Sequence, residues 1–310
     1  MADDGALIEA TGLVKRFGDF TAVDGIDLRV AAGEAFGFLG PNGAGKSSTM
    51  RMIGCVSRPT SGALRILGRD TAADGAAIRS RLGVCPQQDT LDLELTVVEN
   101  LIVYARYFGV PRKVARARAM ELLDFVQLAD RADDKVEPLS GGMKRRLTIA
   151  RALVNEPDIV LLDEPTTGLD PQARHLVWER LFRLKQRGVT LVLTTHYMDE
   201  AEQLCDRLVV MDAGRIVAEG SPRQLIERHS TREVVEVRFG LDPLDGLADK
   251  LDGIGERTEV LPDRVLLYTD DGDAGVAEIA ARGLTPSSVL VRRGSLEDVF
   301  LHLTGRTLVD

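Results

Sequence analysis

The sequence has 310 residues, 44% of them hydrophobic and 28% charged, with a formal net charge of −9. This composition is typical of a folded protein and excludes disordered, collagen-like and low-complexity chains, while the length suggests two domains of about 150 residues each. Residues 231–310 hold 9 basic and 16 acidic side chains, and this negative charge argues against nucleic acid as a partner.

Three cysteines, Cys55, Cys85 and Cys205, are too few and too far apart for a disulfide framework or a zinc site, so we expect reduced thiols. The first residues carry acids where a secretory signal needs basic residues. No segment offers the roughly 18 uninterrupted apolar residues of a membrane helix. We therefore expect a soluble protein, connected to a membrane only through another chain.

Up to about residue 220, apolar strand-like segments alternate with helical ones, which predicts a parallel α/β sheet. Strands are predicted at residues 35–39, 82–85, 159–163, 190–195 and 207–212. Helices are predicted at residues 46–54, 97–109, 113–126, 142–154, 171–186 and 198–205. Residues 94–136 contain no strand, and we interpret them as an inserted helical subdomain. The basic runs within residues 112–118 and 144–146 are expected to be solvated helix faces.

A break at Ser221-Pro222 separates this pattern from a different one. After it, strands are predicted at residues 234–239, 258–261, 265–269 and 289–292, and helices at residues 243–251, 274–281 and 296–303. This β-α-β-β-α-β order, closed by one further helix, predicts a small α+β domain of the ferredoxin-like kind.

The segment from Gly40 to Ser47 reads G-x-x-x-x-G-K-S and lies between an apolar strand and a helix, the context of a phosphate-binding loop. Its glycines let successive backbone N–H groups point at phosphates, and the following helix adds a partial positive charge. Lys46 is expected to reach the β- and γ-phosphates, and the Ser47 hydroxyl to bind Mg²⁺. The predicted loop residues are Gly40, Pro41, Asn42, Gly43, Ala44, Gly45, Lys46, Ser47 and Ser48.

The predicted strand at residues 159–163 ends in two acids, Asp163 and Glu164. A carboxylate at the end of a strand beside a phosphate loop holds Mg²⁺, which is the role we expect for Asp163. Glu164 can accept a proton from the attacking water as a general base. An apolar run ending in Asp-Glu is common by itself, but in the same predicted domain as Lys46 it indicates ATP hydrolysis.

Four more short segments beside predicted strands and helices belong with these two motifs. They are Gln87 after strand 82–85, the helix start Leu139, Ser140, Gly141 and Gly142, then Asp170 after the acid pair, and His196 after strand 190–195. Together with the phosphate loop and the acid pair, they resemble the Q-loop, signature, D-loop and switch histidine of ATP-binding-cassette (ABC) ATPases. The resemblance implies a P-loop ABC cassette fold.

The resemblance also implies a role for each matched residue. Phe17 matches the aromatic residue that stacks on adenine, where the family more often has Tyr. Gln87 would bind Mg²⁺ and sense the membrane partner, although the adjacent Gln88 leaves this register open by one residue. His196 would contact the γ-phosphate and position the water. The signature residues 139–142 and the D-loop Asp170 would act across an interface with a second copy of the chain.

Further segments, at residues 82–101, 104–109, 173–180 and 296–305, resemble nodulation-factor and daunorubicin-resistance-type export ATPases. The resemblance implies a nucleotide-binding domain over residues 1–222, with its helical subdomain at about 94–155, and an accessory domain over residues 223–310. It implies a homodimer that hydrolyses ATP with Mg²⁺ on the cytoplasmic face of a membrane. There it would drive a separate permease that exports a drug-like, lipid-like or oligosaccharide substrate.

Two other functions were weighed against this one. Cassette ATPases of translation carry two phosphate loops, and those of DNA repair carry long coiled coils, whereas this chain has one loop and only 94 residues between Lys46 and Ser140. An import ATPase stays open. For the accessory domain we favour a role in stabilising the dimer or tuning its opening, over a small-ligand sensor or an inert appendage.

Overall fold

A computed structural model describes residues 5–239 and 250–305 of the chain. It divides into two compact units, Met1–Ser221 and Pro222–Asp310. No helix among the described residues combines the length and the apolar character needed to cross a bilayer.

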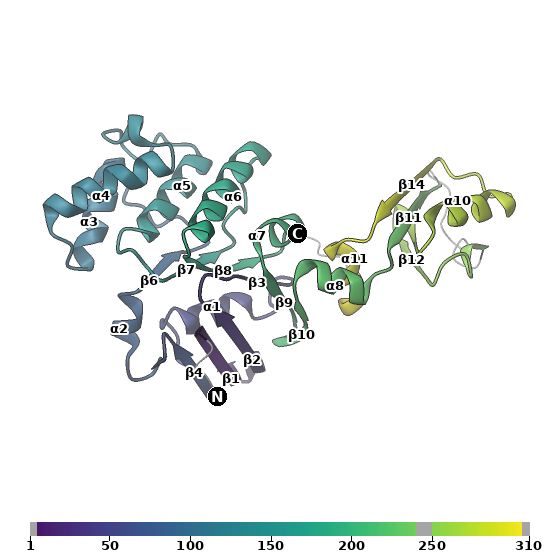
Figure 1. Cartoon of the computed structure of the whole chain (residues 1–310), viewed down its shortest axis with the longest axis horizontal. Coiled ribbons are helices and arrows are strands. Elements are labelled where there is room, and N and C mark those ends of the chain that lie inside the picture. The colour runs from purple at the N-terminus through teal and green to yellow at the C-terminus, as the bar shows by residue number, and fades with distance from the viewer. Residues whose placement is uncertain (1–4, 240–249, 306–310) are drawn as a thin grey trace. The chain divides into compact units, whose positions relative to one another are not determined.

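A six-stranded sheet forms the centre of the first unit (Figure 1). Its strands are β3 (Ala35–Leu39), β6 (Leu82–Cys85), β7 (Ile159–Asp163), β8 (Thr190–Thr195), β9 (Arg207–Asp212) and β10 (Arg215–Gly220), in the order β10-β9-β3-β8-β7-β6. All neighbours are parallel except β9 and β10. Strands β3 and β8 are buried throughout because both faces of the sheet are covered, which confirms the predicted parallel α/β core.

A second, antiparallel sheet precedes most of these strands and was not predicted. It contains β1 (Ala6–Phe17), β2 (Phe20–Ala31), β4 (Ser61–Ile66) and β5 (Arg69–Asp70), in the order β2-β1-β4-β5. Helix α1 (Lys46–Ile53) packs between the two sheets, where Met52 and Ile53 share one core with Leu13 of β1 and Phe38 of β3. The phosphate loop therefore starts from a strand and a helix that are both anchored in the core.

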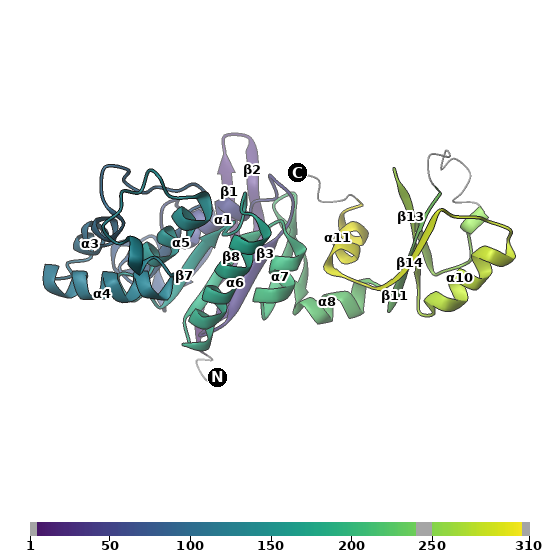
Figure 2. The same ribbon diagram turned by 90° about the horizontal axis from the view of Figure 1, so that it is seen from above.

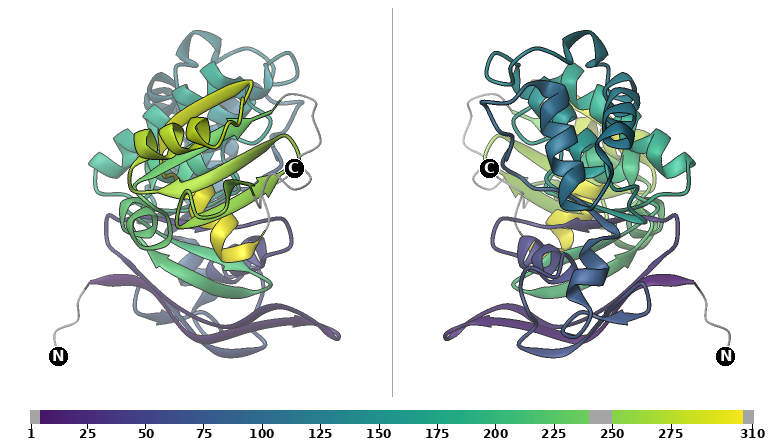
Figure 3. Two further views of the ribbon diagram at one scale, coloured as in Figure 1. Left: turned by 90° about the vertical axis from the view of Figure 1, so that its right-hand side faces the viewer. Right: turned by 90° about the vertical axis from the view of Figure 1, so that its left-hand side faces the viewer.

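The helical insert, drawn in blue in the right-hand panel of Figure 3, has its own hydrophobic core. The helices of the remaining first unit are α2 (Gly75–Arg79), α3 (Val97–Tyr107), α4 (Arg112–Phe125), α5 (Gly141–Ala152), α6 (Pro171–Gln186) and α7 (Met198–Leu204), with a 3₁₀ turn at Ala129–Arg131. Val97 and Leu101 are fully buried in the insert, whereas Tyr107 is 80% exposed. Helices α6 and α7 cover one face of the six-stranded sheet near β8 and β3 (Figure 2).

The second unit is built on a four-stranded antiparallel sheet. Its elements are α8 (Pro222–His229), β11 (Glu233–Arg238), β12 (Arg257–Leu261), β13 (Arg264–Thr269), α10 (Gly272–Ala281), β14 (Ser288–Arg293) and α11 (Leu296–Thr304). The strand order β12-β13-β11-β14 is that of the predicted ferredoxin-like plan, with local order 2-3-1-4. The predicted helix at residues 243–251 lies largely outside the described residues.

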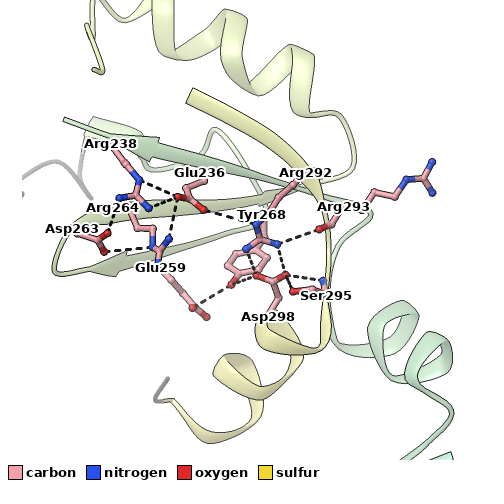
Figure 4. A network of polar contacts seen from close by, with 10 residues as sticks. All are labelled: Glu236, Arg238, Glu259, Asp263, Arg264, Tyr268, Arg292, Arg293, Ser295 and Asp298. Carbon is pink, nitrogen blue, oxygen red and sulfur yellow. Dashed lines mark hydrogen bonds and ion pairs between the residues drawn. The ribbon is translucent and has the colours of Figure 1, made fainter. Parts of the chain in front are cut away.

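A buried carboxylate ties α11 to the sheet of this unit (Figure 4). Asp298 is 1% exposed, and both its oxygens accept hydrogen bonds from Arg292 of β14, at 2.7 and 2.9 Å. The hydroxyl of Tyr268 donates to Oδ1 of Asp298 at 3.2 Å, and the backbone N–H of Ser295 donates to Oδ2 at 2.8 Å. The sequence predicted a helix at residues 296–303, and the structure packs α11 against the sheet and α8.

Candidate nucleotide site

The phosphate loop connects β3 to α1 and depends on glycine where the chain passes close to its neighbours. Gly45 has a φ of 103°, and a Cβ there would lie 2.4 Å from the carbonyl oxygen of Ala22. A Cβ at Gly40 would lie 2.3 Å from the carbonyl oxygen of Met211. Larger residues are therefore excluded at both positions, and glycine lets the chain follow the tight path of a phosphate-binding loop.

Lys46 is 4% exposed and folds back over the loop that precedes it. Its ammonium donates to the carbonyl oxygens of Gly40, at 2.6 Å, and Pro41, at 3.0 Å. Burial lowers the pKa of Lys46, while the negative charges of Glu164 and Asp163 oppose this shift. The loop thus holds one cation in a position from which it can transfer its hydrogen bonds to phosphate oxygens.

Asp163 ends β7 next to the start of α1, as the sequence predicted. The Ser47 hydroxyl lies 3.3 Å from Oδ1 of Asp163, and the Thr194 hydroxyl of β8 donates to the same oxygen at 2.5 Å. A hydroxyl and a carboxylate at one point supply the hard oxygen ligands that Mg²⁺ prefers. The sequence reasoning missed Thr194, whose position on the neighbouring parallel strand fixes the orientation of the carboxylate.

Glu164 has a backbone φ of 47°, in the left-handed region that non-glycine residues rarely adopt. Its N–H is held by the carbonyl and the hydroxyl oxygens of Thr194, at 3.1 and 3.0 Å. This turn directs the carboxylate toward Gln87, which donates to Oε2 at 3.0 Å, and toward His196, whose Nδ1 lies 3.5 Å from the same oxygen. Thr167 also donates to Oε2, at 3.1 Å.

These contacts determine the protonation of the proposed base. The contact with His196 lowers the pKa of Glu164, burial opposes this, and the charge of His196, the Thr167 hydroxyl and the charge of Lys46 lower it further. The net result is a pKa below the ordinary value for a glutamate. Glu164 is therefore ionised at neutral pH, the state in which a carboxylate can accept a proton.

A cavity of about 200 Å³ lies over the phosphate loop. It is lined by Phe20, Ala22, Asn42, Gly43, Ala44, Gly45, Lys46, Ser47, Ser48, Gln87 and Glu164. The structure therefore brings the predicted loop, the predicted Q-loop glutamine and the predicted base together at one place. Of the two candidate glutamines, Gln87 faces this cavity and Gln88 is not among its described lining residues.

The aromatic residue beside this cavity is Phe20 rather than Phe17. The two residues face each other across the β1–β2 turn, and both are more than half exposed. The ammonium of Lys15 lies 4.9 Å from the ring centre of Phe17. Phe20, which the sequence reasoning missed, is a second candidate for contact with a nucleotide base.

The signature residues form the start of α5, away from this cavity. The Ser140 side chain accepts a hydrogen bond from the N–H of Met143 at 3.3 Å, and Asp170 caps α6 by accepting from Ala173 at 2.9 Å. A Cβ at Gly142 would lie 2.8 Å from Cβ of Ala173, so the two helix starts lie side by side. None of residues 139–142 is among the described residues that line the cavity of Lys46.

Arg145 of α5 joins the loops behind the site and corrects the expectation of a solvated basic face at residues 144–146. It is 4% exposed, and its three nitrogens donate to five backbone carbonyls. The acceptors are Pro86 and Gln87 after β6, and Asp163, Glu164 and Pro165 after β7. One guanidinium thus fixes the Q-loop and the acid pair to the signature helix.

Comparison with known proteins now decides the family. A model described as ABC transporter matches residues 23–167, and one described as the C-terminal domain of nodulation factor export protein NodI matches residues 245–305. The Nod factor export ATP-binding protein I of Burkholderia pseudomallei is 50% identical over 305 residues, 98% of this chain and 99% of that protein. The chain belongs to the ABC transporter ATPases.

Other relatives agree with this assignment. The protein of the same description from Rhizobium sp. is 48% identical over 301 residues, 97% of this chain and 98% of that protein. The solved structure of a dimeric ATP-binding cassette in a post-hydrolysis state, bound to ADP and phosphate, is similar with a TM-score of 0.64. It is 30% identical and covers 69% of this chain and 98% of its own. The family predicted from the motifs is confirmed, and the protein is an ATPase of this family.

Proposed function

We propose that this ABC ATPase is the ATP-hydrolysing subunit of an exporter for lipo-oligosaccharides of the Nod factor type. The observation that supports ATP hydrolysis is the single cavity in which the Glu164 carboxylate faces Lys46 and Ser47. The relatives described as Nod factor export proteins, which match along nearly the whole chain, support the export role and the lipo-oligosaccharide class.

In this proposal, Lys46 and the loop N–H groups bind the β- and γ-phosphates, and Ser47, Asp163 and Gln87 hold Mg²⁺. The donor set fits the ion because the hydroxyl of Ser47 and the carboxylate of Asp163 already meet at 3.3 Å, and Gln87 keeps its amide oxygen after donating to Glu164. Bound Mg²⁺ would neutralise charge on the phosphates. Glu164 accepts a proton from water, and His196 and Gln87 orient its carboxylate.

The signature residues act on ATP held by a second copy of the chain. Their helix start is separate from the cavity of Lys46, and the similar dimeric cassette supports this arrangement. Light scattering of Glu164→Gln, with and without Mg·ATP, tests it. We expect a monomer without nucleotide and a dimer with it. A protein that stays monomeric at micromolar concentration in saturating Mg·ATP contradicts the proposal.

A permease docks beside Gln87, at the surface where the helical insert meets the cassette, on the cytoplasmic face of the membrane. A cavity of about 410 Å³ opens beside Gln87 on the cassette, with the exposed Val56 and Val84 in its lining. On the insert itself, Val103 and Tyr107 are exposed, whereas Val97 and Leu101 serve its core. The experiment substitutes Val56, Val84, Val103 and Tyr107 with serine in pairs. We expect lost transport with ATP hydrolysis retained, and unchanged transport in all pairs contradicts the docking surface.

The cargo is tested in cells. We delete the gene for this chain and restore it either as the wild type or as Glu164→Gln. The deletion strain and the Glu164→Gln strain should export no lipo-oligosaccharide, whereas the strain with the wild type should export it. Export of that cargo by the deletion strain, or restoration of only a drug-resistance phenotype, contradicts the assigned substrate class. This readout is separate from ATP hydrolysis, so the two parts of the proposal fail independently.

The second unit stabilises the dimer or tunes its opening in this proposal. A truncation that tests it should follow Ser221 and so remove α8 with the rest of the second unit, because α8 packs on α11 and Leu225 of α8 is fully buried. We expect the truncated chain to bind ATP and to dimerise less well than the full chain at matched concentration. Equal ATP-driven association and transport would contradict the role.

A further inference from the structure

Arg180, in the middle of α6, is a buried cation that pairs with no carboxylate among the described residues. Only 4% of its surface is exposed, and its Nε forms no hydrogen bond. Within the described part of the chain, its one recorded contact is the ring of Phe125, whose centre lies 5.7 Å from Cζ. A ring at this distance is a weak substitute for the water that the guanidinium has lost, since buried charges in proteins are normally paired.

Arg180 lines a cavity of about 480 Å³ where the ends of α4, α5 and α6 meet. Arg118, Arg183 and Arg187 line it as well. Two of these cations are already neutralised, because Arg118 lies 3.0 Å from Glu156 and Arg183 lies 2.6 Å from Glu179. Arg187 is exposed, and its Cζ lies 5.0 Å from the centre of the same Phe125 ring. Arg180 and Arg187 therefore remain without a carboxylate among the described residues.

A further cation lies close to Arg180. Arg146 donates to the carbonyl oxygens of Val126 and Gln127 beyond the end of α4, at 2.7 and 3.4 Å. Burial and the charge of Arg180 lower the pKa of Arg146. Carbonyl groups at helix ends thus accept hydrogen bonds from Arg146, and the carbonyl of Val154 accepts one from Arg118. Among the described residues, no carbonyl accepts a hydrogen bond from Arg180. The unbalanced charge is located at Arg180.

Three acids also line the cavity: Glu121, Asp124 and Glu156, of which Glu156 pairs with Arg118. Glu121 and Asp124 are exposed and form no ion pair with Arg180 among the described residues. Their negative charge limits the size of any anionic group that the cavity can accept. A compact anionic group fits these conditions better than an extended acidic surface. Guanidinium groups bind the oxygens of phosphate through paired hydrogen bonds, and two of them can share one phosphate.

We propose that the cavity between α4 and α6 is a second anion site, in which Arg180 and Arg187 bind a phosphate group. The group belongs either to a free phosphate or phosphate ester, or to the headgroup of an anionic lipid. The site is separate from the nucleotide site, because none of its described lining residues lines the cavity over the phosphate loop.

Calorimetric titration with inorganic phosphate tests the site in the full chain, with a non-hydrolysable ATP analogue and Mg²⁺ saturating the nucleotide site. We compare the wild type with Arg180→Met and with Arg116→Gln, a matched control at an exposed position of α4. We expect phosphate binding by the wild type and the control, and at least tenfold weaker binding by Arg180→Met. The methionine should also raise the melting temperature of the phosphate-free protein, because it removes an unpaired buried charge.

Flotation with vesicles of phosphatidylglycerol, against phosphatidylcholine alone, distinguishes the two sources of phosphate. Binding to the anionic vesicles that Arg180→Met loses assigns the site to a lipid headgroup, and titration by phosphate alone assigns it to a soluble ligand. If Arg180→Met does not fold, Arg187→Gln provides the comparison, because Arg187 is exposed. Absence of both kinds of binding in the wild type, or equal binding by Arg180→Met or Arg187→Gln, overturns the proposal.

Discussion

Oε2 of Glu164 lies 3.5 Å from Nδ1 of His196, at the ends of the neighbouring strands β7 and β8. The same oxygen accepts hydrogen bonds from Gln87 and Thr167. One carboxylate oxygen thus receives contacts from three segments that are far apart in sequence. Because the second oxygen, Oε1, takes no part in these bonds, Glu164 can be oriented through Oε2 and still accept a proton.

Glu164→Gln should lower ATP turnover by about 10²–10⁴-fold and leave ATP binding intact, because it removes a general base without removing a phosphate contact. Steady-state hydrolysis and equilibrium binding of a fluorescent ATP analogue measure the two effects. Glu9→Gln, at a half-exposed position of β1, is the matched control. Hydrolysis by Glu164→Gln at the wild-type rate would show that another group is the base.

Lys46→Ala should weaken ATP binding rather than the hydrolytic step alone. The ammonium is held by Gly40 and Pro41 beside the phosphate cavity, and a hydrogen bond to a charged group contributes about 1.5–3 kcal/mol. The expected loss in affinity is roughly tenfold to a hundredfold, measured by titration with Mg·ATP. An unchanged dissociation constant would contradict the role given to Lys46.

Gln87→Ala should reduce hydrolysis about tenfold to a hundredfold, because a hydrogen bond to a charged group contributes roughly 1.5–3 kcal/mol and this one orients the ionised carboxylate of Glu164. Gln88→Ala provides the matched control at the adjacent position. The comparison also decides the register that the sequence left open. A larger effect at Gln88 than at Gln87 would reverse the assignment.

The order of motifs predicted much of the site because each lies at the end of a continuous apolar strand or the start of a helix. Parallel neighbours bring the ends of β3, β7 and β8 to one edge of the sheet, so residues adjacent to those ends meet. Strand β1 was missed because exposed and buried residues alternate irregularly along it, with several shifts in register against β2. In β2, the regular alternation of residues 26–31 is a strand signal that the sequence reasoning overlooked. The burial pattern of β1 is set by its pairing with both β2 and β4, and the local sequence of β1 contains no information on these partners.

Arg145 and Arg180 show what local patterns leave out. Both lie in helices rich in charged residues, where a basic side chain is more often hydrated. The burial of Arg145 depends on carbonyl groups that follow β6 and β7 and lie 18 to 59 residues away from it in sequence. Spacing within α5 carries no information on these acceptors, so only the tertiary structure identifies the residue.

Arg145→Gln should impair both stability and turnover. A glutamine has two N–H groups and leaves at least three of the five carbonyls without their donor, with an expected loss of about 3–5 kcal/mol in unfolding free energy. The fall in kcat should exceed the change in ATP affinity, because Lys46 and its loop are untouched. Lys144→Gln, which removes a single bond to Glu137, is the control. Loss of stability with wild-type kcat would reduce Arg145 to a structural role.

Asp298 gives the second unit a pH dependence whose sign follows from its environment. Burial raises the pKa of Asp298. The hydrogen bonds and the charge of Arg292 and the hydrogen bonds of Ser295 outweigh this effect, so the pKa of Asp298 lies below the ordinary value. A depressed carboxylate pKa stabilises the fold above the unfolded value of about 3.9 and loses this contribution as pH falls through the folded value. We expect Asp298→Asn to lower the unfolding free energy by about 2 kcal/mol or more at pH 7.

Urea unfolding of the full chain, followed by circular dichroism between pH 7 and pH 3, measures this effect. The difference between wild type and Asp298→Asn should be constant from pH 7 to about 5, because Asp298 stays ionised in both the folded and unfolded states there. It should shrink as pH falls below about 4, where the wild type also protonates this carboxyl group. Asp252→Asn, at an exposed position of the same unit, controls for the general loss of negative charge. A difference that does not change with pH would mean that the shape of the side chain, and not its ionised pair with Arg292, holds α11 to the sheet.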